Sequence, residues 1–205
     1  MRILFQGDSI TDTGRDRDSE GSLGAGYVNK VAEKLRVTYP SRTYECLNKG
    51  ISGNRVIDLQ GRWQEDCLDL MPDVLSILIG VNDVWRKYDS NDPTHVEDFE
   101  NIYRDILTQA QTKTQAKLIL LEPFLLHTPA DRAAWREDLD PKRLVVKKLA
   151  EEFKAVYIEF DQIMTEKALE KSPEYWAADG VHPTDAGHDL IADRWIEVAL
   201  ENHLI

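Results

Sequence analysis

A serine, an aspartate and a histidine in this chain have the chemistry of acyl transfer, although the serine lies far from the other two in the sequence. Ser9 follows a short apolar run and a glycine, so its hydroxyl would be presented where a strand ends. A serine hydroxyl is a weak nucleophile unless a base takes its proton. His182 is the candidate base, and Asp179 precedes it by three residues in an Asp-Gly-Val-His-Pro turn. The carboxylate can fold back onto the imidazole, hold its tautomer and stabilise the imidazolium.

Acyl transfer also requires hydrogen-bond donors that point at the developing oxyanion. Gly53 lacks a side chain, so its backbone N–H can approach a substrate closely. Asn82 can add its side-chain amide, and the N–H of Ser9 makes a third donor. Taken singly, these residue types also have structural interpretations, because serine and asparagine cap helices while aspartate and glycine form turns. Their joint placement after expected strands favours the catalytic interpretation.

The elements that would position these residues follow from the apolar pattern. Short runs rich in β-branched residues alternate with segments whose apolar residues repeat every three to four positions, which is typical of βαβ units. We expect strands at residues 2–6, 43–47, 74–79, 117–122 and 155–160, and helical segments near residues 27–35, 99–110, 144–153 and 190–199. With no repeat or linker, residues 1–205 are predicted to form one α/β domain, a three-layer α/β/α sandwich of about five parallel strands.

Polar clusters directly follow the first three expected strands, at residues 7–9, 48–54 and 80–83, and a fourth at 179–183 precedes the last helix. In an open parallel sheet, ligands bind at the carboxyl ends of the strands, near the point where the strand order reverses. The candidate catalytic residues therefore occur where such a sheet would place a site.

The charge of the chain excludes some functions. The sequence has 25 Lys and Arg against 37 Asp and Glu, a formal net charge of −12. This argues against partners such as nucleic acids and anionic membranes, which reward clustered positive charge. The sequence contains neither a secretory signal nor about 20 consecutive apolar residues. We therefore expect a cytoplasmic protein that acts on a small neutral or cationic molecule.

The residues that bind metals elsewhere do not form a recognisable metal motif here. Cys46 and Cys67 lack CxxC or Cys/His spacing, so we expect two reduced thiols. His188 follows the candidate base by six residues, unlike a standard ligand pair, and Asp185 and Asp189 are expected to be exposed helix charges. The glycine-rich nucleotide motifs and the EF-hand pattern are missing too. We predict neither a metal nor a cofactor.

Aromatic and basic residues near the catalytic blocks are candidates for substrate binding. Trp85 and Arg86 directly follow the Gly-Val-Asn-Asp block. The indole can stack on a sugar ring and the guanidinium can donate to hydroxyls, but a tryptophan packed under the next helix fits equally well. Tyr175 and Trp176, just before the Asp-Gly-Val-His turn, have the same two interpretations.

Two further candidates are Asp8, beside the serine, and Arg55, which follows the Gly53 loop. Arg55 either contacts substrate or, as we favour, forms a surface salt bridge. No long apolar lid is visible, so a short acyl group is expected. Residues 124–126, Phe-Leu-Leu, are the one segment that could line a longer acyl pocket.

Four blocks of the sequence together resemble the SGNH or GDSL-type hydrolases. The blocks are Gly7-Asp8-Ser9-Ile10, Gly53 within residues 50–54, Gly80-Val81-Asn82-Asp83 and Asp179-Gly180-Val181-His182. No GxSxG occurs, so the nucleophile elbow of α/β-hydrolases is not supported. The resemblance implies a triad of Ser9, His182 and Asp179, an oxyanion hole from Ser9, Gly53 and Asn82, and a flavodoxin-like fold.

Within that family, residues 49–54 and 79–86 look like those of intracellular bacterial acetylxylan esterases. This narrower resemblance implies a homo-oligomeric enzyme that removes acetyl groups from xylo-oligosaccharides through an acyl-enzyme. The four blocks leave lysophospholipase, thioesterase and arylesterase activities open. A carbohydrate-binding protein without catalysis is a further alternative, disfavoured by the intact catalytic set.

Overall fold

A single sheet of five parallel strands lies at the centre of the computed structural model, which describes residues 1–19 and 21–205. Its order is β2-β1-β3-β4-β5, and every strand is parallel to its neighbours. The strands are β1 (Arg2–Gly7), β2 (Glu45–Asn48), β3 (Val74–Leu78), β4 (Lys117–Leu121) and β5 (Val156–Ile158). All five expected strands are confirmed, with ends that differ by at most two residues.

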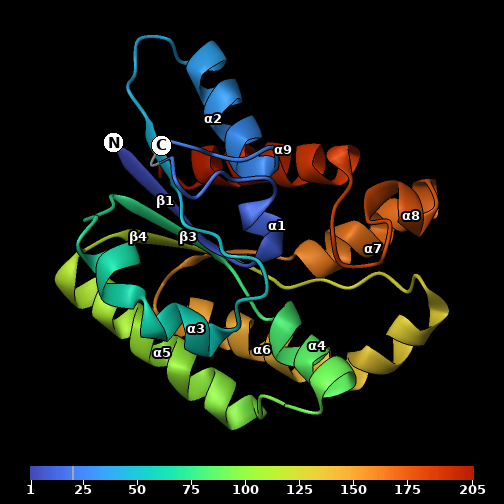
Figure 1. Ribbon diagram of the computed structural model, residues 1–205. Helices are drawn as coiled ribbons and strands as arrows, with labels where there is room; N and C mark the ends of the chain where they lie inside the picture. The colour runs from blue at the N-terminus through green and yellow to red at the C-terminus, as the bar shows by residue number, and fades with distance from the viewer. Residues whose placement is uncertain (20) are drawn as a thin grey trace.

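Helices cover both faces of this sheet. Those longer than two turns are α2 (Tyr27–Thr38), α4 (Val81–Ser90), α5 (Val96–Lys113), α6 (Arg136–Glu152), α7 (Phe160–Glu170) and α9 (Asp185–Glu201). Shorter ones are α1 (Ser9–Asp12), α3 (Val56–Gly61), α8 (Pro173–Trp176), the π-helical η1 (Gln64–Leu68) and the 3₁₀-helical η2 (Ala130–Trp135). Figure 1 shows α2 and α9 on one face, with α3, α5 and α6 on the other. The predicted three-layer sandwich is confirmed.

The two faces of the sheet are buried in two separate apolar clusters. Because successive strand residues point to opposite faces, Ile3 and Phe5 of β1 face α2 and α9, whereas Leu4 faces α3 and α5. Trp195 of α9 packs on Phe5 with ring centroids 5.2 Å apart. Its indole N–H donates to the Ser76 hydroxyl of β3 at 3.0 Å, so this buried polar pair is satisfied.

The strand order reverses beside β1, which has β2 on one side and β3 on the other. The segments that leave β1 and β3 therefore diverge at their carboxyl ends, where ligands bind in such sheets. The loop after β2 closes one side of this opening, because the Ile51 N–H donates to the Gly7 carbonyl at 3.1 Å. A Cβ at Gly7 would overlap the Thr11 hydroxyl and the Leu78 carbonyl, so only glycine fits at the end of β1.

The thiols and the potential metal ligands are dispersed. Cys46 and Cys67 are unpaired, and burial raises the pKa of each thiol to about 12, so both are protonated. Across residues 1–19 and 21–205, no group of three or more His, Cys, Asp or Glu side chains could hold a metal ion. In the same residues, no helix is both long and apolar enough to cross a membrane.

His188 joins α9 to the start of α2. Its Nδ1 accepts the backbone N–H of Tyr27 at 3.1 Å, where Gly26 provides no side-chain cap, and its ring stacks on that of Tyr27. Lys30, one turn further along α2, pairs with Asp185 at 2.7 Å and Asp189 at 3.1 Å. Burial and the Lys30 charge lower the pKa of His188 to about 4. The histidine therefore caps α2 as a neutral acceptor.

We expect this cap to make the fold sensitive to acid. Because the pKa of His188 lies below its value in the unfolded chain, the unfolded state takes up the proton first as the pH falls. The contribution of His188 to the free energy of unfolding should decrease by about 2 kcal/mol between pH 7 and pH 4.5, measured by urea denaturation as the difference between the wild type and His188→Asn. His188→Asn, which keeps an acceptor but cannot titrate, should lose most of this dependence. His203→Asn, at an exposed histidine, is the control, and an unchanged pH dependence in His188→Asn contradicts the assignment.

Candidate active site

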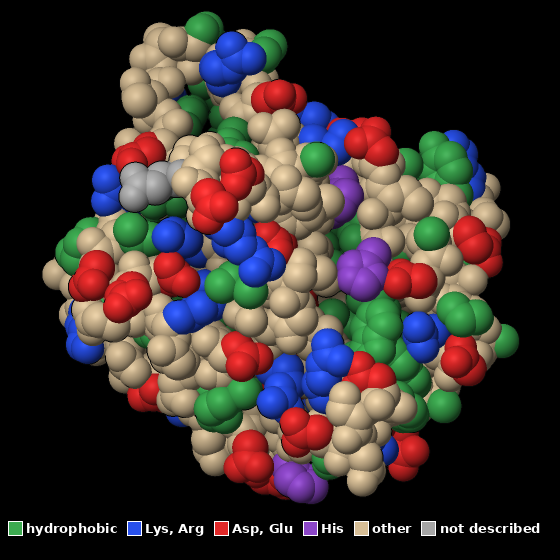
Figure 2. All heavy atoms as spheres, viewed as in Figure 1, with side chains coloured by type: hydrophobic (Ala, Val, Ile, Leu, Met, Phe, Trp, Pro, Cys, Tyr) green, Lys and Arg blue, Asp and Glu red, His purple; other side chains and the backbone are tan. Residues whose placement is uncertain are grey.

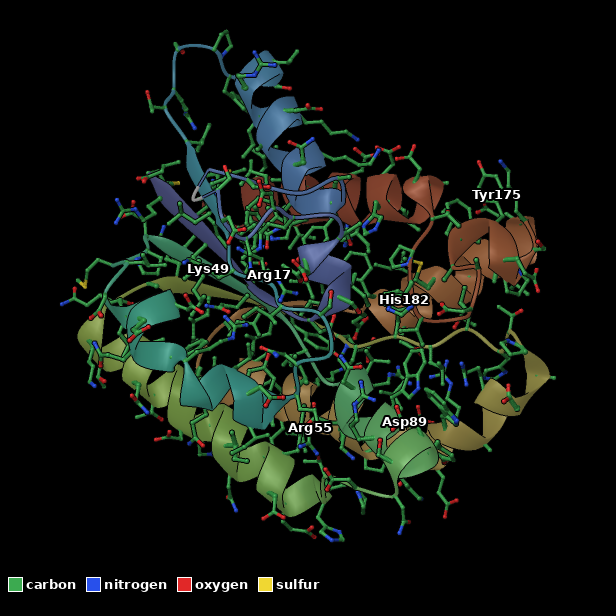
Figure 3. The ribbon with its side chains drawn as sticks, in the orientation of Figure 1. Arg17, Lys49, Arg55, Asp89, Tyr175 and His182 are labelled. Atoms are coloured by element: carbon green, nitrogen blue, oxygen red, sulfur yellow. The ribbon has the colours of Figure 1, made fainter. Side chains whose placement is uncertain are left out.

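Ser9, His182 and Asp179 form a continuous hydrogen-bonded chain, although 173 residues separate the serine from the histidine. The Ser9 Oγ lies 2.8 Å from His182 Nε2, and His182 Nδ1 lies 2.7 Å from the Asp179 Oδ2. Ser9 begins α1 directly after β1, and His182 lies in the loop before α9. With the proton on Nδ1 donated to Asp179, Nε2 is free to accept the serine proton. Figure 3 shows His182 between α1 and α4 at the carboxyl end of the sheet.

The loop that carries His182 is held by its own backbone. Asp179 Oδ1 accepts the N–H groups of Val181 at 3.0 Å and His182 at 2.7 Å, which turns the chain back on itself. Gly180 has a φ of +81°, and a Cβ there would overlap the carbonyl oxygens of Leu126 and Thr128. The glycine of this motif therefore lets the loop lie against the segment that follows β4.

The Asp179–His182 pair favours ionisation of both partners. Burial alone would raise the pKa of Asp179, but the hydrogen bonds from the His182 ring and from two backbone N–H groups hold it well below its ordinary range. The hydrogen bond to Asp179 raises the pKa of His182 above its ordinary 6.5, and burial opposes this only in part. Asp179 is thus a stable anion that can support an imidazolium.

Asp8 lies beneath the nucleophile and not at the surface. Its side chain is 1% exposed, and one carboxylate oxygen caps α1 by accepting the Ile10 N–H at 3.0 Å. Burial raises the pKa of Asp8 to about 7, since the second oxygen has no hydrogen-bond partner among the described residues. The prediction that Asp8 contacts substrate is wrong, because a buried carboxyl cannot reach a sugar.

The candidate oxyanion donors come from two loops that are tied together. Gly53 has a φ of +85°, and Asn82 lies in the first turn of α4, directly after β3. The Asn82 Nδ2 donates one hydrogen to the Asn54 carbonyl at 3.1 Å, which orients the amide beside the Gly53 loop. Because an amide nitrogen carries two hydrogens, the second remains available to a ligand.

Trp85 and Arg86 line the edge of this site, as the sequence predicts. The Trp85 ring lies 5.8 Å from the His182 ring, and the Arg86 guanidinium extends over Gly53 and pairs with Asp89. Both side chains come from α4, one turn after Asn82. Figure 3 shows Asp89 on the same side of the site as Arg55.

Other candidates for substrate binding belong to the framework. Arg55 donates to the Asp92 carboxylate at 3.0 Å, so the favoured interpretation as a salt-bridged residue is confirmed. Trp176 donates its indole N–H to the Lys167 carbonyl at 2.8 Å and packs on the core. Tyr175 lies under the Lys171 ammonium on the outer side of α8, away from His182 (Figure 3). These contacts favour the packing interpretation of Trp176, and a substrate contact by Tyr175 or Trp176 stays a prediction.

The Phe-Leu-Leu segment at residues 124–126 is buried in the core and lines no acyl pocket. In the sequence, this segment is the one candidate for lining a pocket for a long acyl chain. Its burial in the core excludes that role. The segment is apolar because it passes under α6 and α7, where it forms part of the larger apolar cluster with Trp135, Leu139 and Phe160.

Sequence reasoning missed Arg132 and Trp135, which lie on the other side of Trp85. The Arg132 guanidinium carbon is 5.0 Å from the Trp85 ring centroid and 4.0 Å from that of Trp135. With Tyr88 and Asp89, these residues line a surface hollow of about 410 Å³. No motif marks this segment, and only the fold brings it beside α4.

The chain is similar to known proteins over almost its full length. The GDSL-like lipase/acylhydrolase family matches residues 5–190. An acetylxylan esterase from Geobacillus stearothermophilus is 36% identical over 209 residues, covering 98% of this chain and 94% of that protein.

Solved structures agree with these sequence matches. The structure of an acetylxylan esterase from the same organism has a TM-score of 0.86 at 35% identity, with coverage of 96% of this chain and 93% of the other. A GDSL-like lipase from Parabacteroides merdae has a TM-score of 0.92 at 40% identity, with coverage of 96% and 94%.

The raised pKa of His182 predicts the pH dependence of this site. A histidine that acts as a base must be neutral, so kcat/KM should rise with pH through a midpoint above 6.5. Asp179→Asn removes the main cause of the raised pKa of His182, so the midpoint should fall. The substitution also no longer holds the imidazole in the correct tautomer, so kcat should drop by about 10⁴. Hydrolysis of 4-nitrophenyl acetate from pH 5 to 9 provides the measurement, with His203→Asn as control. A wild-type midpoint below 6.5 would refute the assignment.

Proposed function

Because the chain belongs to the GDSL-like lipase/acylhydrolase family and is a carboxylic ester hydrolase, we propose that it deacetylates xylo-oligosaccharides with Ser9 as nucleophile. The observation that carries this proposal is the chain of contacts from Ser9 Oγ through the His182 ring to Asp179, at 2.8 and 2.7 Å. Such a chain supplies a nucleophile, a base and a group that orients the base.

The proposed reaction has two halves. In the first, His182 Nε2 takes the proton from Ser9 while Oγ attacks the acetyl carbonyl carbon. The oxyanion that forms accepts hydrogen bonds from the N–H groups of Ser9 and Gly53 and from the Asn82 amide. His182 then donates its proton to the sugar oxygen as the C–O bond breaks, which leaves acetyl-Ser9. In the second half, His182 deprotonates a water that attacks the acetyl-serine, and acetate leaves as Ser9 regains its proton.

The surroundings of the nucleophile favour a short acyl group on a polar leaving group. The segment at residues 124–126 is part of the core, so the sequence's one candidate for an acyl-chain pocket is filled by the protein itself. Trp85 and Arg86 offer an aromatic face and guanidinium donors beside His182 and Gly53. We therefore assign Trp85 and Arg86 to the sugar side of the ester. The relative from Geobacillus stearothermophilus is named an acetylxylan esterase.

The proposal also includes a homo-oligomer that works in the cytoplasm. Leu169 of α7 is 86% exposed, and Tyr175 on the neighbouring α8 is 43% exposed. Leu169 and Tyr175 are the exposed apolar side chains that we assign to the contact between chains. Light scattering gives the mass in solution, and a monomer at micromolar concentration contradicts this part of the proposal.

The assignment of Ser9 and Asn82 predicts two losses of different size. Ser9→Ala should abolish turnover of 4-nitrophenyl acetate, because Ser9 Oγ is the hydroxyl oxygen that lies 2.8 Å from His182 Nε2. Asn82→Ala should lower kcat by about 10² to 10³, the usual effect of removing one oxyanion donor. Ser41→Ala, at an exposed serine, is the matched control, and urea denaturation checks that each variant is folded. Turnover by Ser9→Ala at the wild-type rate would refute the mechanism.

Substrate preference tests the proposed activity itself. For a site that accepts short acyl groups, kcat/KM should fall by about tenfold or more from 4-nitrophenyl acetate to the octanoate ester. Acetylated xylo-oligosaccharides should lose acetyl groups one at a time, as followed by mass spectrometry. Faster hydrolysis of the octanoate would point instead to the lipase or thioesterase activities of the family. Binding of the sugar without hydrolysis of any ester would point to a carbohydrate-binding protein.

A further inference from the structure

We infer that Arg132 is a positioning residue that holds the Asp179–His182 loop and keeps a positive charge next to the catalytic imidazole. This inference rests on the proposed function of His182 as the base. Arg132 belongs to η2, a segment outside the four sequence blocks of the family. Its side chain contacts the Trp85 ring and the Asp179 backbone.

The guanidinium of Arg132 packs on two indoles that also contact each other, with their ring centroids 5.2 Å apart. Its central carbon lies 4.0 Å from the centroid of the Trp135 ring and 5.0 Å from that of Trp85. A guanidinium in this position is attracted to the negative faces of both rings and is shielded from water on those sides. Trp135 is buried in the core, so it gives the arginine a rigid support.

Two routes connect Arg132 to the catalytic loop. Its Nε donates to the backbone carbonyl of Asp179 at 3.4 Å, on the residue that orients His182. The second route passes through Trp85, whose ring centroid is 5.0 Å from the guanidinium carbon and 5.8 Å from the centroid of the His182 ring. Arg132 therefore supports the loop through its backbone and the imidazole through an aromatic contact.

The charge of Arg132 is less neutralised than that of the other arginines around the site. Arg55 pairs with Asp92 at 3.0 Å, and Arg86 pairs closely with Asp89. The ion pair of Arg132 among the described residues is with Asp131 at 3.9 Å, and that carboxylate is 72% exposed to water. A long pair with a solvated carboxylate screens little of the charge. Figure 2 shows positive and negative side chains interleaved on this face.

Three charged groups act on His182 from the elements packed around it, and a fourth titratable group there is neutral. Asp179, on the same loop, and Asp8, at the end of β1, favour the imidazolium. Arg132, on η2, opposes it, and His188 of α9 is held neutral by burial. Arg132 is thus the cation that limits how far the two carboxylates raise the pKa of His182.

This balance suits a residue that must act first as a base and then as an acid. A base is useful only while it is neutral, and an imidazolium with a lower pKa gives its proton more readily to the leaving sugar oxygen. Arg132 serves both needs by electrostatics, while its backbone contact keeps the imidazole in place. Arg132 itself touches none of the reacting atoms.

Two substitutions separate the charge of Arg132 from its shape. Arg132→Lys keeps the charge but loses the planar stack and the Nε donor, whereas Arg132→Met keeps an apolar stem and loses the charge. Arg194→Met is the matched control, because Arg194 is an exposed arginine on α9 that pairs with Glu197 at 2.7 Å. Urea denaturation and tryptophan fluorescence check the fold of each variant.

The first readout does not depend on activity. The His182 ring is titrated by NMR in the Ser9→Ala background, with its signal assigned by comparison with His182→Asn. In Arg132→Met, the pKa of His182 should rise by about half a unit, the size expected for loss of one nearby, partly solvated cation. In Arg132→Lys and in Arg194→Met, it should stay within about 0.2 units of the reference.

The second readout is the pH profile of 4-nitrophenyl acetate hydrolysis with Ser9 intact. The midpoint of kcat/KM should shift upward in Arg132→Met alone, while both substitutions lower the maximal kcat/KM by about three- to tenfold because the loop is less well held. Equal midpoints in Arg132→Met and the wild type, or equal shifts in the Met and Lys variants, overturn the inference. If the wild type hydrolyses no ester, the proposed function fails, but the NMR titration still decides whether Arg132 acts on His182.

Discussion

The contact between the Ser9 hydroxyl and His182 Nε2 is the constraint on which the rest of the site depends. It joins the end of strand β1 to a loop that lies just before the last helix. The sheet makes this contact by placing β1 beside the reversal of strand order, and α9 fixes the other end by packing Trp195 on Phe5. The 2.8 Å distance between Ser9 Oγ and His182 Nε2 therefore depends on how the sheet and its helices pack together.

Electrostatics around this contact is a balance of groups on different elements. Asp179 and the buried Asp8 draw His182 toward the imidazolium, and Arg132 opposes them. Burial of the imidazole also opposes the two carboxylates, so its surroundings and charged groups on different elements together set the affinity of His182 for its proton. A residue that acts first as a base and then as an acid needs an intermediate affinity.

Sequence reasoning predicts what depends on local pattern and fails where only the fold decides. The strands followed from their apolar runs, Ser9 from a polar block at a strand end, and His182 from a polar block before the last helix. The burial of Asp8 was not predictable, because a carboxylate is normally exposed and the neighbouring residues in the sequence do not indicate that other elements cover it. From the sequence alone, the Trp176 side chain could point toward the substrate or toward the core, and the position of α7 was needed to decide between the two. Arg132 lies in no recognisable motif. Its proposed role depends on the packing of η2 beside α4, which the spacing of residues in the sequence does not indicate.

The order of the catalytic residues along the chain has a consequence for biosynthesis. Synthesis runs from the N-terminus, so Ser9 and both loops of the proposed oxyanion hole are made well before Asp179 and His182. A nascent chain that stops before residue 179 has the proposed nucleophile without its base. On the proposed mechanism, ester hydrolysis therefore begins only after the Asp179–His182 loop has been made and has folded beside Ser9.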